Sequence, residues 1–316
     1  MKLIITIDTE EDNWGEYNLS RYSLENIKRI DRLQDLFDRF GVIPTYLVTY
    51  PVATDKRASS ILKRIMREGR CEIGTHCHPW NTPPFEEERN ARNSMLCNLP
   101  EDLQFKKIDT LHHEITRNFG KEPTSFRAGR WGFGESTARC LMRLSYKIDS
   151  SIIAFQNWDV YGGPDYSNVF PGAFSWEWKN EPVAAPYQEL LEIPATAGYK
   201  QGNFALCEKL WKALDNQYAQ KLHLKGILAR LGALNKIWLS PETSNSSQMM
   251  MLTKTLMNEG YSTLNMFFHS TALKAGLSTF VKTQDDEARF LRSIEEYLVF
   301  ARDAGIESIT LSESSA

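Results

Sequence analysis

The chain has 316 residues, of which 42% are hydrophobic, and its formal net charge is −3. This composition suffices for one large barrel or two modest domains. Because no stretch is rich in lysine and arginine, we expect no nucleic-acid partner. No apolar run approaches a membrane span, and the N-terminus lacks a signal-peptide pattern. Together with five cysteines in no pairing pattern, these features indicate a soluble cytoplasmic protein.

Strand-like and helix-like segments alternate along the chain, which predicts an α/β fold with parallel strands. The first half contains strands at 2–7, 44–49, 71–74, 125–127 and 147–149, with helices from Ser23 to Phe40 and at 59–68, 100–119 and 135–144. The second half contains strands at 190–193, 237–240, 264–268 and 308–311, with helices at about 204–218, 247–259 and 285–304.

The domain organisation follows from this alternation. We expect one domain over residues 1–316, because no repeat or linker interrupts the pattern. Two departures from it are an aromatic-rich loop insertion at about 155–188 and a helical excursion at about 200–235. The insertion contains many glycine, proline and aromatic residues, which favours long ordered loops over a flexible linker.

Polar residues gather where the predicted strands end, at Asp8, His76, Arg127, Asp149, Glu242 and His269. In parallel α/β barrels the catalytic groups lie at this rim. Side chains alternate along a strand, so Asp8 and Glu10 should share one side, and His76 and His78 should share another. Two imidazoles with one or two carboxylates can hold a divalent metal. The same alternation directs Cys77 away, although a thiolate ligand is the alternative.

These residues carry a resemblance to the polysaccharide deacetylase, or NodB-homology, family. Five family motifs have counterparts in order, beginning with an acidic motif at Asp8–Glu10 and ending with Met266–Ser270. Between them lie a histidine motif at 72–80, an arginine motif at 126–132 and a further motif at 146–151. The resemblance implies a distorted (β/α) barrel of seven to eight mostly parallel strands.

The resemblance also implies one divalent metal ion, with zinc favoured and cobalt, nickel or manganese as alternatives. The family usually has adjacent aspartates and histidines four residues apart, whereas here the acids and the histidines are each two apart. The expected ligands are therefore Glu10, His76 and His78, with Glu11 or Asp12 as alternative carboxylates.

The activity implied is hydrolysis of an N-acyl, usually N-acetyl, group on a sugar or saccharide precursor. Asp8 would be the general base, Arg127 would hold Asp8 ionised, and His269 would be the general acid. Asp149 would orient His269.

The expected substrate-binding residues are Trp80 and Trp131 at the acyl pocket, the backbone near Gly129, and Trp158 against the sugar. Tyr161, Tyr166 and Phe170 could also stack on sugar rings.

Two alternative functions remain open at this level, and a third is disfavoured. A deformylase would act on a formamido sugar, and a degenerate family member would bind sugar without catalysis. An amidohydrolase barrel also uses a His-x-His motif, but there the motif follows the first strand, and here it follows the third predicted strand. The sequence does not specify the number of subunits.

Overall fold

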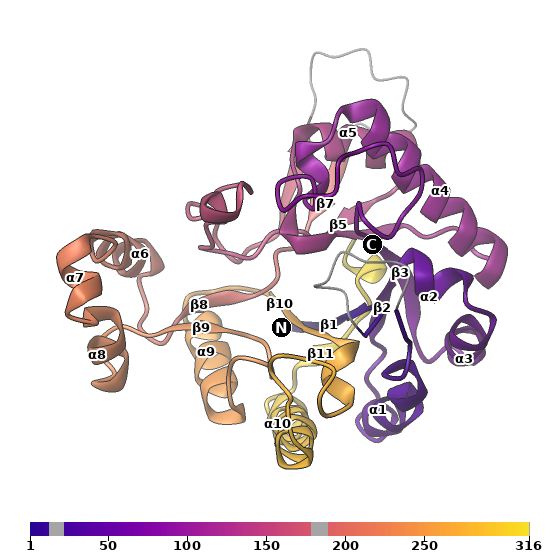
Figure 1. Cartoon of the computed structure of the whole chain (residues 1–316). Coiled ribbons are helices and arrows are strands. Elements are labelled where there is room, and N and C mark those ends of the chain that lie inside the picture. The colour runs from indigo at the N-terminus through magenta and orange to yellow at the C-terminus, as the bar shows by residue number, and fades with distance from the viewer. Residues whose placement is uncertain (13–21, 178–188, 316) are drawn as a thin grey trace.

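The structure is a computed structural model that describes residues 1–12, 22–177 and 189–315. Its centre is a nine-stranded sheet with the order β10-β1-β2-β3-β4-β5-β7-β6, in which β11 also pairs with β1 (Figure 1). All pairings are parallel except that of β6 with β7. The sheet curls into a half-barrel, so the predicted α/β fold with seven to eight mostly parallel strands is confirmed.

The strands of this sheet lie within a few residues of the predicted ones, with the exception of β6. They are β1 Lys2–Thr9, β2 Thr45–Val48, β3 Glu72–Cys77, β4 Ser125–Ala128, β5 Ile148–Asp149, β6 Phe174–Glu177, β7 Glu189–Glu192, β10 Thr263–His269 and β11 Glu307–Ser308. Strand β6 was not predicted and lies within the aromatic insertion, of which residues 178–188 are outside the described part of the chain.

Helices cover the outer face of the sheet along both of its halves (Figure 1). They are α1 Ile30–Asp38, α2 Tyr50–Thr54, α3 Lys56–Arg67, α4 Glu101–Phe119, α5 Glu135–Arg143, α9 Ser246–Asn258 and α10 Gln284–Asp303. Apolar residues at helical spacing face the sheet; in α4 these include Leu103, Ile108, Leu111 and Ile115. Gly120 ends α4 in the left-handed conformation, with φ of 80°.

The helix predicted to begin at Ser23 begins later. A short 3-10 turn over Ile27–Arg29 leads directly into α1. The Ser23 hydroxyl donates a hydrogen bond to Asp12, which also accepts from the backbone N–H groups of Glu25 at 2.8 Å and Asn26 at 3.1 Å. Asp12 therefore organises the turn before the helix. Helix-capping patterns in the sequence could not reveal this contact, because Asp12 lies eleven residues before Ser23 in the chain.

A second, two-stranded sheet lies beside β10. It contains β8 Ala197–Tyr199 and β9 Lys236–Trp238, which pair antiparallel. The strand predicted at 237–240 therefore does not join the main sheet. Backbone hydrogen bonds from Thr196 to Asn265 at 3.0 Å and from Phe267 to Leu239 at 3.2 Å connect this small sheet to β10. It extends the wall of the half-barrel beyond its open edge.

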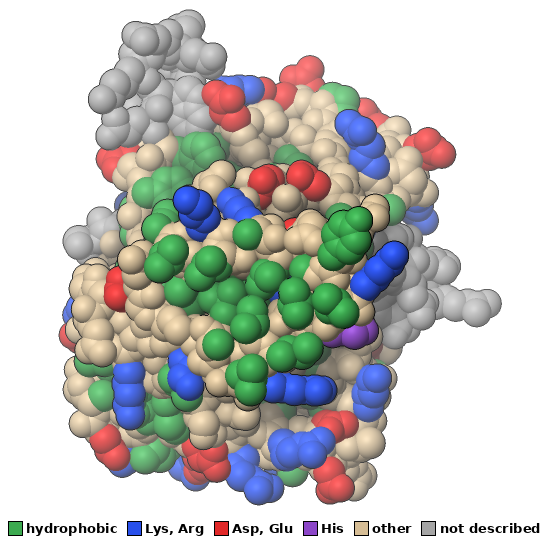
Figure 2. All heavy atoms as spheres, turned by 90° about the vertical axis from the view of Figure 1, so that its left-hand side faces the viewer, with side chains coloured by type: hydrophobic (Ala, Val, Ile, Leu, Met, Phe, Trp, Pro, Cys, Tyr) green, Lys and Arg blue, Asp and Glu red, His purple; other side chains and the backbone are tan. Residues whose placement is uncertain are grey.

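Between β8 and β9 the chain leaves the body of the protein. Three helices, α6 Phe204–Ala213, α7 Gln217–Lys221 and α8 Leu224–Arg230, project to one side of the sheet (Figures 1 and 2). The predicted single helix at 204–218 is therefore divided, with its first part ending at Ala213. This part of the chain corresponds to the predicted helical excursion.

The register of the parallel strands determines which polar side chains are neighbours. Asp8 of β1 is paired with His269 of β10, and His76 of β3 is paired with Arg127 of β4. All four residues lie at the carboxyl ends of their strands, where ligands bind in parallel α/β sheets. Residues more than 250 positions apart thus become adjacent at one rim.

Further along the sheet, two carboxyl groups are buried side by side. Asp149 of β5 and Glu192 of β7 are register partners, and neither is exposed to solvent. Burial and the adjacent Asp149 charge raise the pKa of Glu192 well above its usual value. Burial also raises the pKa of Asp149, although hydrogen bonds from Glu192 and Ser151 oppose this change. We infer that the pair keeps a proton at pH values at which solvent-exposed carboxyl groups have lost theirs.

This proton makes the stability of the fold depend on pH. A raised pKa means that the native state binds more protons than the unfolded chain, so stability should fall as pH rises above the usual glutamate value of 4.5. The slope should approach about 1.4 kcal/mol per pH unit over the range in which the unfolded chain has lost this proton and the native pair still holds it. Urea unfolding of Glu192→Gln should show a weaker decline. Glu189→Gln, which changes an exposed carboxylate of the same strand, should behave like the wild type, and equal slopes in all three proteins would contradict the shared proton.

Candidate active site

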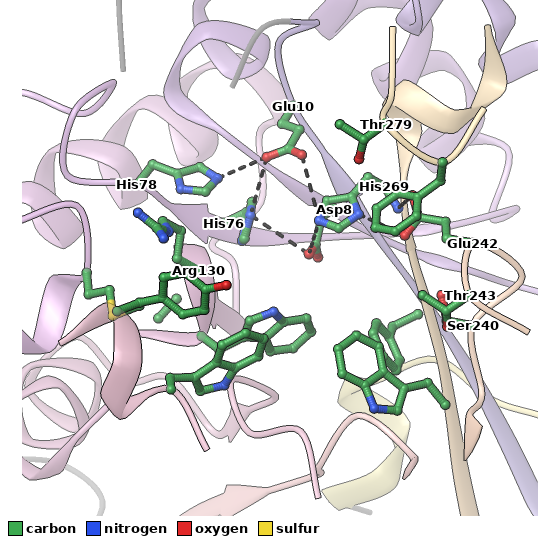
Figure 3. Close-up of a pocket in the computed structure, with 18 residues that line it drawn as sticks. Asp8, Glu10, His76, His78, Arg130, Ser240, Glu242, Thr243, His269 and Thr279 are labelled. Atoms are coloured by element: carbon green, nitrogen blue, oxygen red, sulfur yellow. Dashed lines mark hydrogen bonds and ion pairs between the residues drawn. The ribbon is translucent and has the colours of Figure 1, made fainter. Parts of the chain in front are cut away.

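A cavity of about 360 Å³ opens at the carboxyl ends of β1, β3, β4 and β10 (Figure 3). Its volume lies in the range of small-molecule sites. Polar groups occupy one end, namely Asp8, Glu10, His76, His78, Glu242 and His269. Aromatic side chains also line the cavity, and we call them the aromatic wall: Trp131, Trp158, Tyr161, Trp238, Phe267 and Phe280.

Glu10, His76 and His78 form a buried group that could hold a metal ion. One ligand atom from each lies within 4.8 Å of the others. The Nε2 atom of His78 is 2.9 Å from Glu10 Oε2, and that of His76 is 3.7 Å from the same oxygen. The alternative carboxylates lie elsewhere, since Glu11 accepts hydrogen bonds from Asn81 and Asp12 holds the turn before α1.

The hydrogen bonding of these residues suits a cation. His76 Nδ1 is 3.0 Å from the backbone oxygen of Arg127 and donates to it, so Nε2 is the nitrogen that faces Glu10 and could bind a metal ion. Glu10 Oε1 is buried and accepts no hydrogen bond from any residue that the structure describes. An acceptor without a donor at this depth is costly unless a cation satisfies it.

The pKa shifts indicate the same preference. Burial raises the pKa of Glu10 to about 7, against the opposing effect of the neighbouring histidines. Although burial lowers the pKa of His76, the Asp8 and Glu10 carboxylates raise it overall. Burial and the two other imidazoles lower the pKa of His78 well below its usual value, which leaves a neutral ring. The cluster therefore favours a bound positive charge, which a metal ion can supply in place of protons.

His78 is held between two neighbours. Trp80 packs on its ring with centroids 4.0 Å apart, and a β-carbon at position 129 would lie 2.0 Å from His78 Nδ1. Position 129 must therefore be glycine for the ring to occupy this place. Trp80 and Gly129 were both expected to contact substrate, but the structure places each directly against His78. Trp80 does not line the cavity. We infer that Trp80 and Gly129 position the His78 ring.

Asp8 is fixed by a fully buried arginine. Arg127 Nη1 donates to Asp8 Oδ1 at 2.7 Å, and the other guanidinium nitrogens donate to Thr6 and to the backbone oxygen and hydroxyl of Ser150. Although burial raises the pKa of Asp8, Arg127 and two histidines lower it below its usual value of 3.8. The second oxygen, Oδ2, is 3.9 Å from His76 Nε2 and 3.8 Å from His269 Nε2.

His269 faces Asp8 across this end of the cavity, with Glu242 behind it (Figure 3). Its Nδ1 lies 2.9 Å from Glu242 Oε2. Burial would lower the pKa of His269, but Glu242, with Glu10 and Asp8, raises it to about 10. The expected partner of His269 was Asp149. The structure places Glu242 in that position, while Asp149 accepts hydrogen bonds from the backbone and hydroxyl of Ser151.

The turn after β4 shapes the aromatic wall. Arg130 and Trp131 have φ values of 54° and 59°, a left-handed conformation that costs on the order of 1–3 kcal/mol in a non-glycine residue. This turn directs both side chains into the cavity. Trp158 lines the same cavity. Tyr166 lies outside the cavity, since it is buried and its hydroxyl donates to the backbone oxygens of Trp131 and Phe133.

Several cavity residues were not anticipated. Glu242 was recognised as a carboxylate at the rim, but nothing in the sequence indicated its partner. Trp238 and Phe280 reach the cavity from β9 and from the loop before α10, far from any motif. Their positions in the sequence do not predict this placement, because it depends on how the small sheet and the loop before α10 pack in the fold.

The space at position 129 gives a direct test of the predicted metal ligands. Gly129→Ala should displace the His78 ring and weaken zinc binding on the order of tenfold to a hundredfold, the usual cost of disturbing the support of a ligand. Gly134→Ala is the matched control, because its added carbon would meet Cys97 at an ordinary 3.5 Å. Metal content after equilibrium dialysis measures both variants. Equal zinc binding by the two would show that His78 is not a ligand.

Comparison with known proteins gives one curated relative, while no family model matches the chain. The peptidoglycan deacetylase of Helicobacter pylori (strain ATCC 700392 / 26695) is 25% identical over 168 residues, which cover 52% of this chain and 52% of that protein. The chain thus matches about half the length of this relative.

Solved structures share the architecture over nearly the whole chain. A protein from Mycobacterium smegmatis assigned as a polysaccharide deacetylase has a TM-score of 0.50 at 14% identity, covering 98% of this chain and 93% of its own. Another so assigned, from Pseudomonas aeruginosa PAO1, has a TM-score of 0.50 at 12% identity, covering 96% and 85%. These identities show a shared fold. The curated relative and these shared folds agree with the resemblance of the five ordered motifs to the NodB-homology family of polysaccharide deacetylases.

Proposed function

We propose that this protein is a metal-dependent deacetylase that removes an N-acyl group, most often N-acetyl, from a sugar or saccharide precursor. The observation that carries the proposal is the pair formed by Asp8 and His269. Their Oδ2 and Nε2 atoms lie 3.8 Å apart beside the Glu10, His76 and His78 group. The environment lowers the pKa of the first residue and raises that of the second, as expected for a general base and a general acid.

Glu10, His76 and His78 would hold the divalent ion, with zinc favoured by two imidazoles and one carboxylate. When bound, such an ion polarises the acyl oxygen and lowers the pKa of its water to roughly 7. Three protein ligands also leave a position for that water. The remaining tasks are moving two protons and orienting the sugar, which fall to other residues of this chain.

Asp8 would accept the proton of the attacking water. Its lowered pKa keeps the carboxylate ionised at neutral pH, so it is always available as an acceptor. The 2.7 Å hydrogen bond from Arg127 occupies Oδ1 and leaves Oδ2 facing the cavity. Arg127 thus acts as a positioning residue, because it does not line the cavity.

His269 would donate a proton to the departing amine nitrogen. An amine is a poor leaving group unless it is protonated, and the raised pKa of His269 keeps its imidazole charged at neutral pH. Glu242 accepts from Nδ1, so the Nε2–H group points toward Asp8 and the metal ligands. The aromatic wall, which includes Trp131 and Trp158, offers flat apolar surfaces that suit a sugar ring.

Acetate release from N-acetylated amino sugars and their oligomers tests the proposed activity. The protein loaded with zinc should release acetate, a chelator should abolish the release, and added zinc should restore it. Formate measured in parallel with N-formyl sugars would identify a deformylase. Zinc binding without release of either acid, over a broad set of acylated sugars, would contradict the enzymatic proposal and leave a sugar-binding protein.

Asp8→Asn should separate proton transfer from metal binding. The amide retains the shape of the side chain but cannot accept the water proton, so kcat should fall on the order of a hundredfold to ten thousandfold. Zinc content, measured by elemental analysis, should remain near that of the wild type, because Asp8 is not among the three proposed ligands. Full activity in this variant would remove Asp8 as the base.

Glu242→Gln should lower kcat on the order of tenfold or more, with a smaller change in KM, because the general acid loses its orienting charge. Losing that charge lowers the pKa of His269, so the alkaline limb of the kcat profile should move to lower pH. Glu242→Asp should restore part of the activity. Thr243→Ala, a change at the adjacent cavity residue, is the control and should leave the profile in place. An unshifted alkaline limb in Glu242→Gln would contradict this role.

A further inference from the structure

The helical arm, which we define as residues 200–236, differs in charge from the rest of the chain. It contains seven lysine and arginine residues and two acidic ones, a formal charge of +5 in a protein whose net charge is −3. Both acidic residues are already paired, Asp215 with Lys225 and Glu208 with Lys236. Lys209, Lys221 and Arg230 are exposed and form no ion pair with any residue that the structure describes. The surface of the arm is therefore strongly basic.

The same arm exposes large apolar side chains in a regular pattern. The six residues are between 45% and 81% exposed and form three pairs four positions apart: Leu206 and Leu210, Tyr218 and Leu222, Ile227 and Leu231. Residues four apart lie on one face of a helix, and each pair lies in or just after one helix of the arm. Fourteen large hydrophobic residues are exposed in the described chain, and six of them fall in these 26 positions.

Figure 2 shows this side of the molecule directly. Hydrophobic side chains gather in its middle, with lysine and arginine side chains around them. A groove of about 350 Å³ also lies within the arm, lined by Leu214, Ala219, His223, Leu224, Lys225 and Gly226. Exposed apolar patches with a polar rim are typical of interaction surfaces. Here the rim is cationic, so the partner should present both apolar and anionic groups.

We propose that the helical arm docks this protein on the surface of a membrane containing anionic lipids. Leucine and tyrosine side chains would enter the boundary between headgroups and acyl chains, while Lys209, Lys221 and Arg230 would contact lipid phosphates. Each of these cations lies three positions after the first residue of an apolar pair and so borders the apolar face. Amphipathic helices that combine leucine with lysine or arginine bind membrane surfaces. The helices that the structure describes lack the length and apolar character to cross a bilayer, so the contact would be peripheral.

Charge argues against a second copy of the chain as the occupant of this surface. A symmetric dimer through the arm would place one surface of formal charge +5 against another, and like charges held together oppose association. An anionic lipid surface is complementary instead. A lipid surface is also deformable, so it can fit side chains carried by three separate short helices. A rigid protein partner would have to match each helix individually.

Sedimentation with lipid vesicles tests the proposal on the full-length chain. The wild type should sediment with vesicles of phosphatidylcholine mixed with phosphatidylglycerol, and much less with phosphatidylcholine alone. High salt should release it, because the attraction of surface charges is screened. Failure to bind the anionic vesicles at low salt would overturn the proposal.

Two variants separate the charged and apolar contributions. Lys221→Gln with Arg230→Gln should weaken partitioning roughly twentyfold to thirtyfold, from about fivefold for each cation removed, or about 1 kcal/mol. Leu222→Glu with Leu231→Glu should abolish binding, and these exposed positions should tolerate the change without unfolding. The matched controls are Arg67→Gln and the pair Met257→Glu with Val299→Glu, exposed residues outside the arm. Arm variants that bind as tightly as the controls would contradict the assignment.

Light scattering, which measures the oligomeric state, tests the alternative that a second copy of the chain binds this surface. A wild-type dimer that Leu222→Glu with Leu231→Glu dissociates, together with absent vesicle binding, would assign the surface to self-association and overturn the membrane proposal. Deacetylase activity on small sugars is a separate measurement, because no arm residue changed in these variants lines the catalytic cavity. Failure of the proposed activity would therefore leave the membrane test intact.

Discussion

The buried contact between Arg127 and Asp8 is the interaction on which the rest of the site depends. A fully buried guanidinium is costly unless each of its donors finds an acceptor. Here the acceptors are supplied by β1, through Asp8 and Thr6, and by the segment after β5, through Ser150. The backbone oxygen of Arg127 then accepts from His76. One residue thus joins three parts of the sheet and orients both the candidate base and a candidate metal ligand.

The site is electrostatically divided around this contact. The Arg127 guanidinium pairs with the Asp8 carboxylate, whereas the Glu242 carboxylate pairs with the His269 imidazole. Each partner stabilises the charged form of the group that it touches, which separates two pKa values that burial alone would bring together. The two arrangements are opposite in sign, so a proton acceptor and a proton donor can coexist 3.8 Å apart.

Sequence reasoning located most of the half-barrel and the residues at its rim because both follow local rules. Alternation along a strand places Asp8 with Glu10 and His76 with His78, and apolar periodicity locates helices such as α4. Contacts made across the fold could not be read in this way. Glu242 behind His269 and Asp12 before α1 depend on the packing of distant segments. The expectation that Asp149 would orient His269 failed for the same reason, since its neighbour is set by the pairing of β5 with β7.

The parallel pairing of β1 with β10 has a consequence for how such a protein can diverge. Asp8 and His269 are register partners, so their spacing follows from the distance of about 4.8 Å between hydrogen-bonded strands. Loops that carry Trp158 or Phe280 can lengthen, shorten or change sequence without altering that spacing. In the proposed enzyme, reaction chemistry and substrate choice would therefore reside in separable parts of the molecule, the first in a backbone ladder and the second in the segments that surround it.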